Sequence, residues 1–551
     1  MTEREELLKL RALLAEKEQR IADQNKLIEK QRIQIENMIQ ALLHARKKIF
    51  GTSSEKSQTD GQLSLFESVQ ELAQEFLKDQ QKITVKSHEK TPRRSGVREE
   101  MLSGLKKELV EYVIDEGEEC PKCGGKLKVI GEEIVRTEVE FIPAKLIVKQ
   151  IVRQVAKCEN CGKKDSENKT PVFVKAGVPA PILPHSFSTP SLAAQVMHLK
   201  FMLGVPFNRQ EKEWFRMGLV LTRADMAYWT IRCSEEWFFP IYQKIHEQLL
   251  KSEVLHMDET RIQCNKEDGR KASTDSFMWV MRSAACEEVQ AAYFYYSQSR
   301  STGVAKSLLG EYPGYLITDA YAGYNKAGNY KRCLCWAHCR RYFIESIPLD
   351  NKGKEIPGSK GAEGREYINL LFKIEEETEN LSFEEKKKKR QEASKPILDA
   401  FWSWIEKTAV MHTTNENLTK ALTYAVNQKK ELETFLEDGR IPLSNNLCEA
   451  NIKPFATARR AWLFADTPKG ARANAVLYTL VESARANNLD VYEYLKYLLE
   501  EMPNNDHLQQ PELLDEYLPW SKELPDRCQL TLKHKKCLKK WRLQFSMNDV
   551  N

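Results

Sequence analysis

Apolar residues recur every seven positions near the start of the chain. The members of this series are Leu7, Leu14, Ile21, Ile28, Ile35, Leu42 and Ile49. The companion series three residues later is mixed, and no proline or glycine interrupts the segment. A sustained seven-residue repeat predicts a coiled coil over residues 1–50, which would pair two copies of the chain. The alternative is a long helix that packs on its own protein.

The pattern then changes twice before residue 180. Residues 51–100 are rich in turn-forming and basic residues and predict a flexible linker with one short amphipathic helix. Residues 101–180 alternate apolar and polar positions like strands. Two Cys-x-x-Cys pairs lie in this region, formed by Cys120, Cys123, Cys158 and Cys161. Two such knuckles supply the four thiolates of a tetrahedral site, so we predict a zinc-ribbon-like domain with one structural Zn²⁺.

Helical periodicity replaces the alternation in residues 181–250. Three short helices are expected, at 188–203, 208–217 and 222–233, because glycines and a proline break the pattern between them. Thr222 can cap the third helix. Short helices joined by glycine-containing turns are typical of a helix-turn-helix DNA-binding region and equally of a plain helical bundle.

Two apolar runs that end in a carboxylate follow. A strand from Glu253 is predicted to end at Asp258, and a shorter strand from Leu316 is predicted to end at Asp319. A single aspartate in such a place is more often a turn residue, so the case depends on partners. Carboxylates at strand ends, backed by cationic side chains, are what metal-dependent phosphodiester chemistry requires.

The order of the elements around these aspartates indicates the fold. The expected elements between them are two strands, 277–282 and 289–296, and a helix, 302–309. Strand, strand, strand, helix, strand, helix is the order of a ribonuclease-H-like core, which we assign to residues 251–344. The first and fourth strands are neighbours in that arrangement, so Asp258 and Asp319 would lie side by side. Like charges this close are unfavourable unless divalent cations neutralise them.

A charged helical insertion is predicted for residues 345–435, with its lysine-rich run as solvated surface. The catalytic core would resume over residues 436–505, and residues 506–551 would form a basic C-terminal tail. The fold class is therefore multidomain α/β.

The resumed core carries a further carboxylate, Glu449, in the first turns of a helix that begins near Asn446, which Ser444 or Asn445 can cap. The candidate DNA contacts are basic or aromatic residues: Arg340, Arg341, Lys453, Arg459, Arg460 and Trp462. A carboxylate followed by a basic cluster and aromatic rings suits the holding of bent or frayed DNA near metal ions.

Composition excludes several classes of protein. The 551 residues exceed one ordinary core, and the net charge of +5 means that any nucleic-acid surface must come from local patches. No apolar run is long enough to span a membrane and the N-terminus is charged, so we expect a cytoplasmic protein without a membrane partner. Thirteen cysteines indicate thiols and metal ligation rather than a disulfide framework.

Together these motifs resemble those of transposases of the insertion-sequence-66 family, which belong to the DDE class. The stretches that carry the resemblance are "FGTSSEK" (50–56), "CPKCGG" (120–125), "GVPFNRQE" (204–211), "HMDET" (256–260), "TDAYAGYN" (318–325), "CWAHCRRYF" (335–343), "DGRIPLSNNLCEANIKPF" (438–455) and "RRAWLF" (459–464). They follow the family order over roughly residues 1–505. Matched residue by residue, the catalytic triad falls on Asp258, Asp319 and Glu449.

The resemblance implies two Mg²⁺ or Mn²⁺ ions per active site, held by that triad, which cut each element end and direct the freed 3′ hydroxyl into target DNA. It implies double-stranded DNA as partner, both terminal inverted repeats and target, in the bacterial nucleoid. Members of the family are typically encoded alongside small accessory proteins, which are candidate partners. The alternatives are a metal-dependent nuclease without strand transfer and a catalytically silent, transposase-derived DNA-binding protein.

Departures from the family pattern affect no metal ligand. Arg459-Arg460-Ala461 stands where an Arg-Lys-Asn run is expected, Ala458 replaces a glycine, and Ala450 stands where an arginine is common. These positions concern DNA contacts. Cys335 and His338 resemble a Cys-x-x-His motif that follows the second aspartate in several DDE families, and we interpret the pair as structural.

Overall fold

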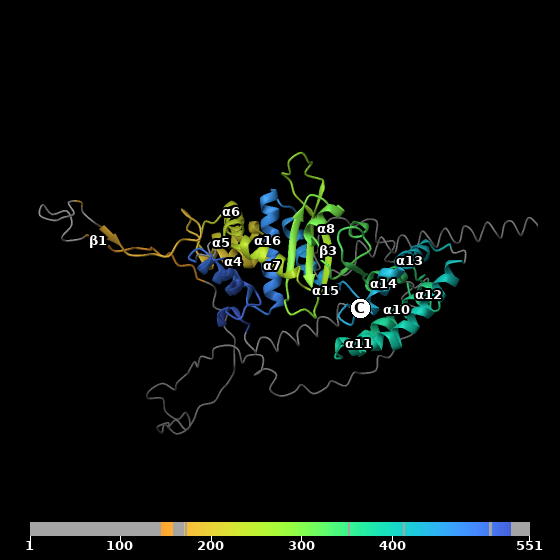
Figure 1. Cartoon of the computed structure of the whole chain (residues 1–551). Helices are drawn as coiled ribbons and strands as arrows, with labels where there is room; N and C mark the ends of the chain where they lie inside the picture. Colours follow the sequence, from red (N-terminus) through yellow and green to blue (C-terminus); the bar gives the residue numbers. More distant parts are fainter. Residues whose placement is uncertain are drawn as a thin grey trace, which may run out of the picture. The chain divides into compact units, whose positions relative to one another are not determined.

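The computed structural model describes residues 145–157, 170, 173–350, 353–410, 414–505 and 510–530 (Figure 1). The predicted coiled coil, the linker and all four cysteines of the predicted zinc site lie outside these residues. The chain divides into two compact units, Met1–Met101 and Leu102–Asn551, and every described residue belongs to the second. Among the described helices, none is long and apolar enough to cross a membrane.

Two short strands precede the helical region. β1 (Val155–Lys157) pairs antiparallel with β2 (Phe173–Lys175), with Ala156 opposite Val174. β1 lies in the stretch that the alternating pattern assigned to strands, and it ends directly before Cys158.

The three helices predicted next are confirmed. They are α4 (Pro190–Phe201), α5 (Phe207–Arg216) and α6 (Arg223–Cys233). Gly204 and Gly218 separate them, and both have positive φ angles, 69° and 87°, a conformation that favours glycine. Thr222 caps α6 as predicted, since its side chain accepts a hydrogen bond from the backbone N–H of Asp225. A π-helical turn (Ser234–Phe238) then leads into α7 (Phe239–Leu249).

A mixed five-stranded sheet forms the centre of the described region. Its strands are β3 (Val254–Gln263), β4 (Asp275–Ser283), β5 (Ala292–Ser297), β6 (Tyr315–Thr318) and β7 (Lys331–Leu334). Their order is β5-β4-β3-β6-β7, antiparallel from β5 to β3 and parallel from β3 to β7. The first and fourth strands are neighbours, as predicted, with His256 opposite Ile317. The predicted end of the first strand at Asp258 is wrong: β3 continues to Gln263 because β4 pairs with it over that whole length.

Helices cover both faces and one edge of the sheet (Figure 1). They include α8 (Thr302–Leu309), α9 (Trp336–Glu345), α15 (Asn446–Trp462) and α16 (Pro468–Ala486), and α17 (Val491–Glu501) packs on α4 and α16. The backbone N–H groups of Ala292 and Phe294 on the edge strand β5 donate to Ser483 Oγ at 3.1 Å and Thr479 Oγ1 at 2.8 Å on α16. Because unpaired groups on an edge strand attract other chains, α16 protects this edge.

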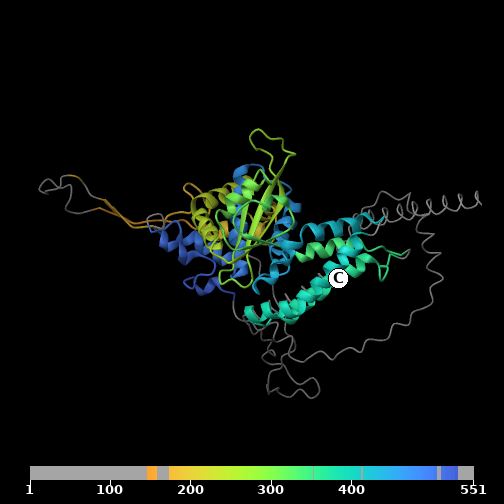
Figure 2. The ribbon, with the colours of Figure 1, turned by 45° about the vertical axis from the view of Figure 1, so that its right-hand side comes forward.

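The predicted insertion is helical (Figure 2), and its buried residues are continuous with those of β6, β7 and α9. Its helices are α10 (Lys360–Glu377), α11 (Phe383–Lys389), α12 (Lys395–Ala409), α13 (Glu416–Asn427) and α14 (Lys429–Glu433). Phe401 and Leu422 of the insertion are buried with Trp336 and Phe343 of α9. The prediction that the charged run is only solvated surface is wrong at Arg390, which is fully buried.

The chain returns from the insertion beside the place where it left. Trp336 N donates to Leu443 O at 2.8 Å, and Asn445 N donates to the sulfur of Cys335 at 3.1 Å. α15 therefore starts against the first turn of α9. Farther on, in the region assigned to the tail, the 3₁₀ turn Pro511–Tyr517 packs on α7 and the 3₁₀ turn Asp526–Cys528 packs on α17.

Candidate active site

Three segments that are far apart in the sequence carry the predicted carboxylates. Asp258 lies within β3, Asp319 follows the last residue of β6, and Glu449 lies in the first turn of α15. Burial, first of all, raises the pKa of Asp258 to about 8, and Glu259, Asp319 and Glu449 add to the rise. The three predicted carboxylates therefore lie within electrostatic reach of one another, an arrangement that costs free energy unless a cation neutralises them.

The sheet register explains why the two aspartates meet. His256 and Ile317 are opposite each other on parallel strands, so two residues farther along each chain come Asp258 and Asp319. One oxygen of each carboxylate is used locally: Asp258 Oδ1 accepts from Glu259 N at 2.8 Å, and Asp319 Oδ1 accepts from Tyr321 N at 3.0 Å.

Glu259 has a role that the sequence reading missed. Its side chain is 1% exposed, pairs with Arg300 at 2.5 Å and accepts a hydrogen bond from the hydroxyl of Tyr324. The guanidinium of Arg300 lies 3.9 Å from the ring centre of Tyr321. Burial raises the pKa of Glu259, while Tyr324 and Arg300 oppose the rise. Neighbouring residues of a strand point to opposite faces of the sheet, so the sequence could have predicted that Glu259 and Asp258 have different surroundings.

Asn445 fixes the start of α15 on the sheet. The prediction that Ser444 or Asn445 caps this helix through its side chain is wrong, because the buried amide of Asn445 binds β3 instead. Its Nδ2 donates to Met257 O at 3.3 Å, and its Oδ1 lies 2.9 Å from His256 Nδ1, which must carry the proton. Burial lowers the pKa of His256 to about 4, so this imidazole is neutral at physiological pH.

Replacing Asn445 with alanine is expected to lower the free energy of unfolding by about 1–3 kcal/mol, since it leaves buried groups of β3 unpaired. DNA processing should also weaken, because Glu449 is one turn away. Urea unfolding measures the first effect. Asn329→Ala, which changes an exposed asparagine, is the control and should shift stability by less than about 0.5 kcal/mol. Equal stability of both variants would contradict the role given to Asn445.

Cys335 and His338 lie at the carboxylates and not in a remote part of the fold. The sulfur of Cys335, a ring nitrogen of His338 and a carboxylate oxygen of Glu449 lie within 4.8 Å of one another. His338 Nε2 is 3.9 Å from Glu449 Oε1. Burial lowers the pKa of His338, and the charge of Glu449 opposes that effect. The structural role predicted for the pair stays a prediction.

The candidate DNA contacts differ in their accessibility. Arg341, Lys453 and Arg460 are exposed. Arg340 Nε donates to Asn369 Oδ1 of α10 at 2.7 Å, so this arginine also joins α9 to the insertion.

The end of α15 holds the remaining candidates. Arg459 and Trp462 are half-buried, and the indole packs edge-to-face on Phe455 with ring centres 5.8 Å apart. Leu463, which follows, is exposed and has a φ of 64°, a strained value for a residue with a side chain. No pattern in the sequence marks this position.

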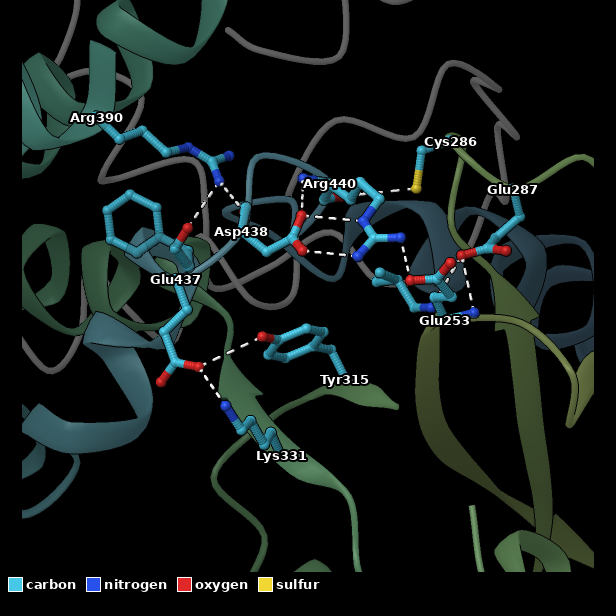
Figure 3. Close-up of polar contacts among 11 residues, drawn as sticks. Glu253, Cys286, Glu287, Tyr315, Lys331, Arg390, Glu437, Asp438 and Arg440 are labelled. Atoms are coloured by element: carbon cyan, nitrogen blue, oxygen red, sulfur yellow. Dashed lines mark hydrogen bonds and ion pairs between the residues drawn. The ribbon is translucent and has the colours of Figure 1, made fainter. Parts of the chain in front are cut away.

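Polar contacts at the other end of the strands hold the returning chain in place (Figure 3). Arg440 pairs with Asp438, with Nη2 2.8 Å from Oδ2, and also with Glu253 ahead of β3. Hydrogen bonds and charge from Arg440 hold the pKa of Asp438 below its usual range. Glu437 accepts from Lys331 Nζ of β7 at 2.7 Å. The segment that leads into α15 is thereby tied to two strands.

Comparison with family models gives four matches along the chain. Residues 185–473 match the "Transposase IS66 family", and residues 118–162, which contain all four knuckle cysteines, match the "zinc-finger binding domain of transposase IS66". Residues 479–520 match the "IS66 C-terminal element", and residues 40–110 match the "Transposase C of IS166 homeodomain".

Individual proteins give weaker likenesses over long stretches. The uncharacterized protein y4hP of Sinorhizobium fredii is 28% identical over 449 residues, 78% of this chain and 77% of the relative. Protein y4jD of the same organism is 25% identical over 503 residues, 88% of this chain and 93% of the relative. Among solved structures, the Drosophila P element transposase strand transfer complex covers 65% of this chain and 92% of that chain, with 14% identity and a TM-score of 0.20. Because the first family match spans more than half of the 551 residues, the chain belongs to the IS66 family of transposases.

Proposed function

We propose that this transposase cuts DNA at the ends of its insertion sequence and joins each freed 3′ hydroxyl to target DNA, with Asp258, Asp319 and Glu449 as metal ligands. The convergence of these three carboxylates from separate segments carries the proposal. Burial raises the pKa of Asp258, and the charges of Glu259, Asp319 and Glu449 add to the rise, so a bound cation would stabilise the ionised carboxylates.

The donor set fits divalent metal ions. All three side chains offer oxygen, and Glu449 Oε1 is buried without a hydrogen-bond partner among the described residues. Oxygen ligands suit Mg²⁺ or Mn²⁺, and two such ions, when bound, supply an activated nucleophile and stabilise the leaving oxygen. The protein's own part is to hold the three carboxylates in place through β3, β6 and Asn445.

The ribonuclease-H-like core is part of this proposal. The strand order β5-β4-β3-β6-β7, with only β4 antiparallel to the other four strands, supports it, as does α8 between β5 and β6. The exposed cations Arg341, Lys453 and Arg460 lie on α9 and α15, the helices that carry His338 and Glu449, and we assign them to DNA phosphates.

The remaining partners belong to the proposal as well. Terminal repeats and target DNA follow from the reaction, and the homeodomain match at 40–110 supports DNA recognition by the N-terminal part. Pairing of two copies through residues 1–50 would bring both element ends into one complex. Accessory proteins of the same element stay candidate partners.

A strand-transfer assay tests the function. Labelled oligonucleotides that carry the element's terminal repeat, a supercoiled target plasmid and Mg²⁺ are incubated with the full-length protein. We expect cleaved ends and joined products, both of which require the metal. Cleaved ends without joined products would favour a nuclease. Bound but uncut DNA would favour a catalytically silent DNA-binding protein.

The zinc site has a separate test. Cys120→Ser is expected to lower the zinc content of the purified protein by about one equivalent, because three thiolates hold the ion far less well than four. Elemental analysis measures the loss. Cys264→Ser, at a buried cysteine beside the sheet, is the control and should keep its zinc. Unchanged zinc in Cys120→Ser would exclude the four-cysteine site.

A further inference from the structure

Glu449 faces a second set of ligand atoms besides the aspartates. The sulfur of Cys335, an imidazole nitrogen of His338 and an oxygen of Glu449 all lie within 4.8 Å of one another. A thiolate, an imidazole and a carboxylate together prefer Zn²⁺ over Mg²⁺, since sulfur and nitrogen are softer ligands than oxygen. Three protein ligands leave the fourth tetrahedral position for water.

The sulfur of Cys335 is supported in the way that a metal-bound thiolate requires. It lies directly ahead of the ten-residue helix α9, whose N-terminus favours negative charge. Asn445 N donates to it at 3.1 Å. Burial raises the pKa of the Cys335 thiol, and the backbone N–H groups of Asn445, His338 and Ala337 oppose that rise.

Two atoms of this cluster have unmet bonding capacity. His338 Nδ1 and Glu449 Oε1 are both buried, and neither has a hydrogen-bond partner among the described residues. Buried polar atoms without partners are uncommon in proteins, and a bound ion is one explanation for them. A metal ion that takes the carboxylate oxygen would satisfy one of them.

We propose that Cys335, His338 and Glu449 form a binding site for Zn²⁺, separate from the oxygen site at Asp258 and Asp319 but sharing Glu449 with it. On binding, the sulfur–metal bond forms as the thiol of Cys335 releases its proton to solvent. Glu449 is then held by zinc and lost to the magnesium site, so occupied protein does not cut DNA. This inhibitory consequence rests on the proposed function, whereas the binding site does not.

Cobalt is the probe for binding because its thiolate complexes absorb strongly. Full-length protein, first loaded with Zn²⁺ at its four-cysteine site, is titrated with Co²⁺ in excess Mg²⁺. We expect the wild type to bind one Co²⁺ more than Cys335→Ser and to show a thiolate-to-cobalt charge-transfer band that this variant lacks. Cys333→Ser changes a fully buried cysteine outside the cluster and should keep the band.

A second variant guards against loss of folding in Cys335→Ser. The ring of His338 is partly exposed, and His338→Gln should weaken cobalt binding at least tenfold. Equal cobalt uptake and identical spectra for the wild type, Cys335→Ser and His338→Gln would overturn the site.

Inhibition is measured on Mg²⁺-dependent cleavage of terminal-repeat DNA. We expect the Zn²⁺ concentration for half inhibition to be at least tenfold higher for Cys335→Ser than for the wild type. If cobalt binds but zinc inhibits both proteins equally, the inhibitory role is overturned. If no protein cleaves DNA, the proposed function fails, and the cobalt titration still decides the binding site.

Discussion

Asp258→Asn, Asp319→Asn and Glu449→Gln are each expected to slow Mg²⁺-dependent cleavage of element ends by at least about a hundredfold, since even changes next to metal ligands cost 10–100-fold. The amide keeps the shape of the side chain but removes its charge and one ligand oxygen. Binding to terminal repeats should persist. Single-turnover cleavage and gel-shift assays measure the two properties. Asp268→Asn, at an exposed aspartate of the same domain, is the control, and joined products from any triad variant would refute the assignment.

The stability of the Asp258→Asn protein shows whether its loss of cleavage comes from lost catalysis or from lost folding. In EDTA, this variant should be more stable than the wild type by at least about 1 kcal/mol, because each unit of pKa shift is worth about that much. The pKa of Asp258 rises from 3.8 unfolded to about 8 folded, so stability of the wild type falls as pH rises between these values. The difference should therefore vanish below about pH 4 and be complete above about pH 8. Thermal unfolding across this range is the measurement.

Replacing Arg390 with methionine is expected to destabilise the insertion by about 3–5 kcal/mol, the cost of breaking a buried ion pair. Its fully buried guanidinium donates to both oxygens of Glu375 at 2.6 and 2.7 Å and to the carbonyls of Phe435, Asp438 and Ile441 at 2.7–2.8 Å. Methionine fills similar space but leaves the buried carboxylate of Glu375 with Lys386, 2.8 Å away, as its remaining ion-pair partner. Cleavage should fall too, because these carbonyls belong to the segment that leads into α15 (Figure 3).

Two further variants isolate the buried charge. Lys388→Met removes an exposed cation two residues earlier and should leave stability within about 0.5 kcal/mol of the wild type. Arg390→Met combined with Glu375→Leu should recover part of the loss, because the buried carboxylate is then removed together with the guanidinium. Limited proteolysis and urea unfolding measure both effects. A single Arg390→Met protein as stable as Lys388→Met would contradict this account.

Periodicity predicted most of the elements, because each depends on neighbours along the chain. The bounds of α8 match the predicted 302–309, and α4, α5 and α6 are shifted by only one or two residues. The meeting of Asp258 and Asp319 followed from the order of the strands. Glu449 joined them only through the family resemblance, since a helix after a long insertion has no local signal that connects it with the sheet.

The predictions that failed depend on distant partners. β3 runs past Asp258 because β4 pairs with it, which single-strand alternation cannot reveal. Asn445 is a residue type that often caps helices, but its side-chain oxygen accepts a hydrogen bond from His256 of β3 instead. Arg390 sits in a lysine-rich run that reads as solvent-facing, and only the fold places Glu375 against it.

The return of the chain to its point of departure has a consequence for how the family can vary. Trp336 binds Leu443, so the whole insertion is one closed loop whose ends are fixed on the same few residues. Loop closure costs only about 0.6 kcal/mol more for each doubling of length. Changes of length in the loops that join the insertion's helices should thus be nearly neutral for the position of Glu449 as long as the contacts of Arg390 are kept, and relatives of different length can keep one active-site geometry. A search for such relatives should therefore leave the interval between the second and third carboxylates unconstrained.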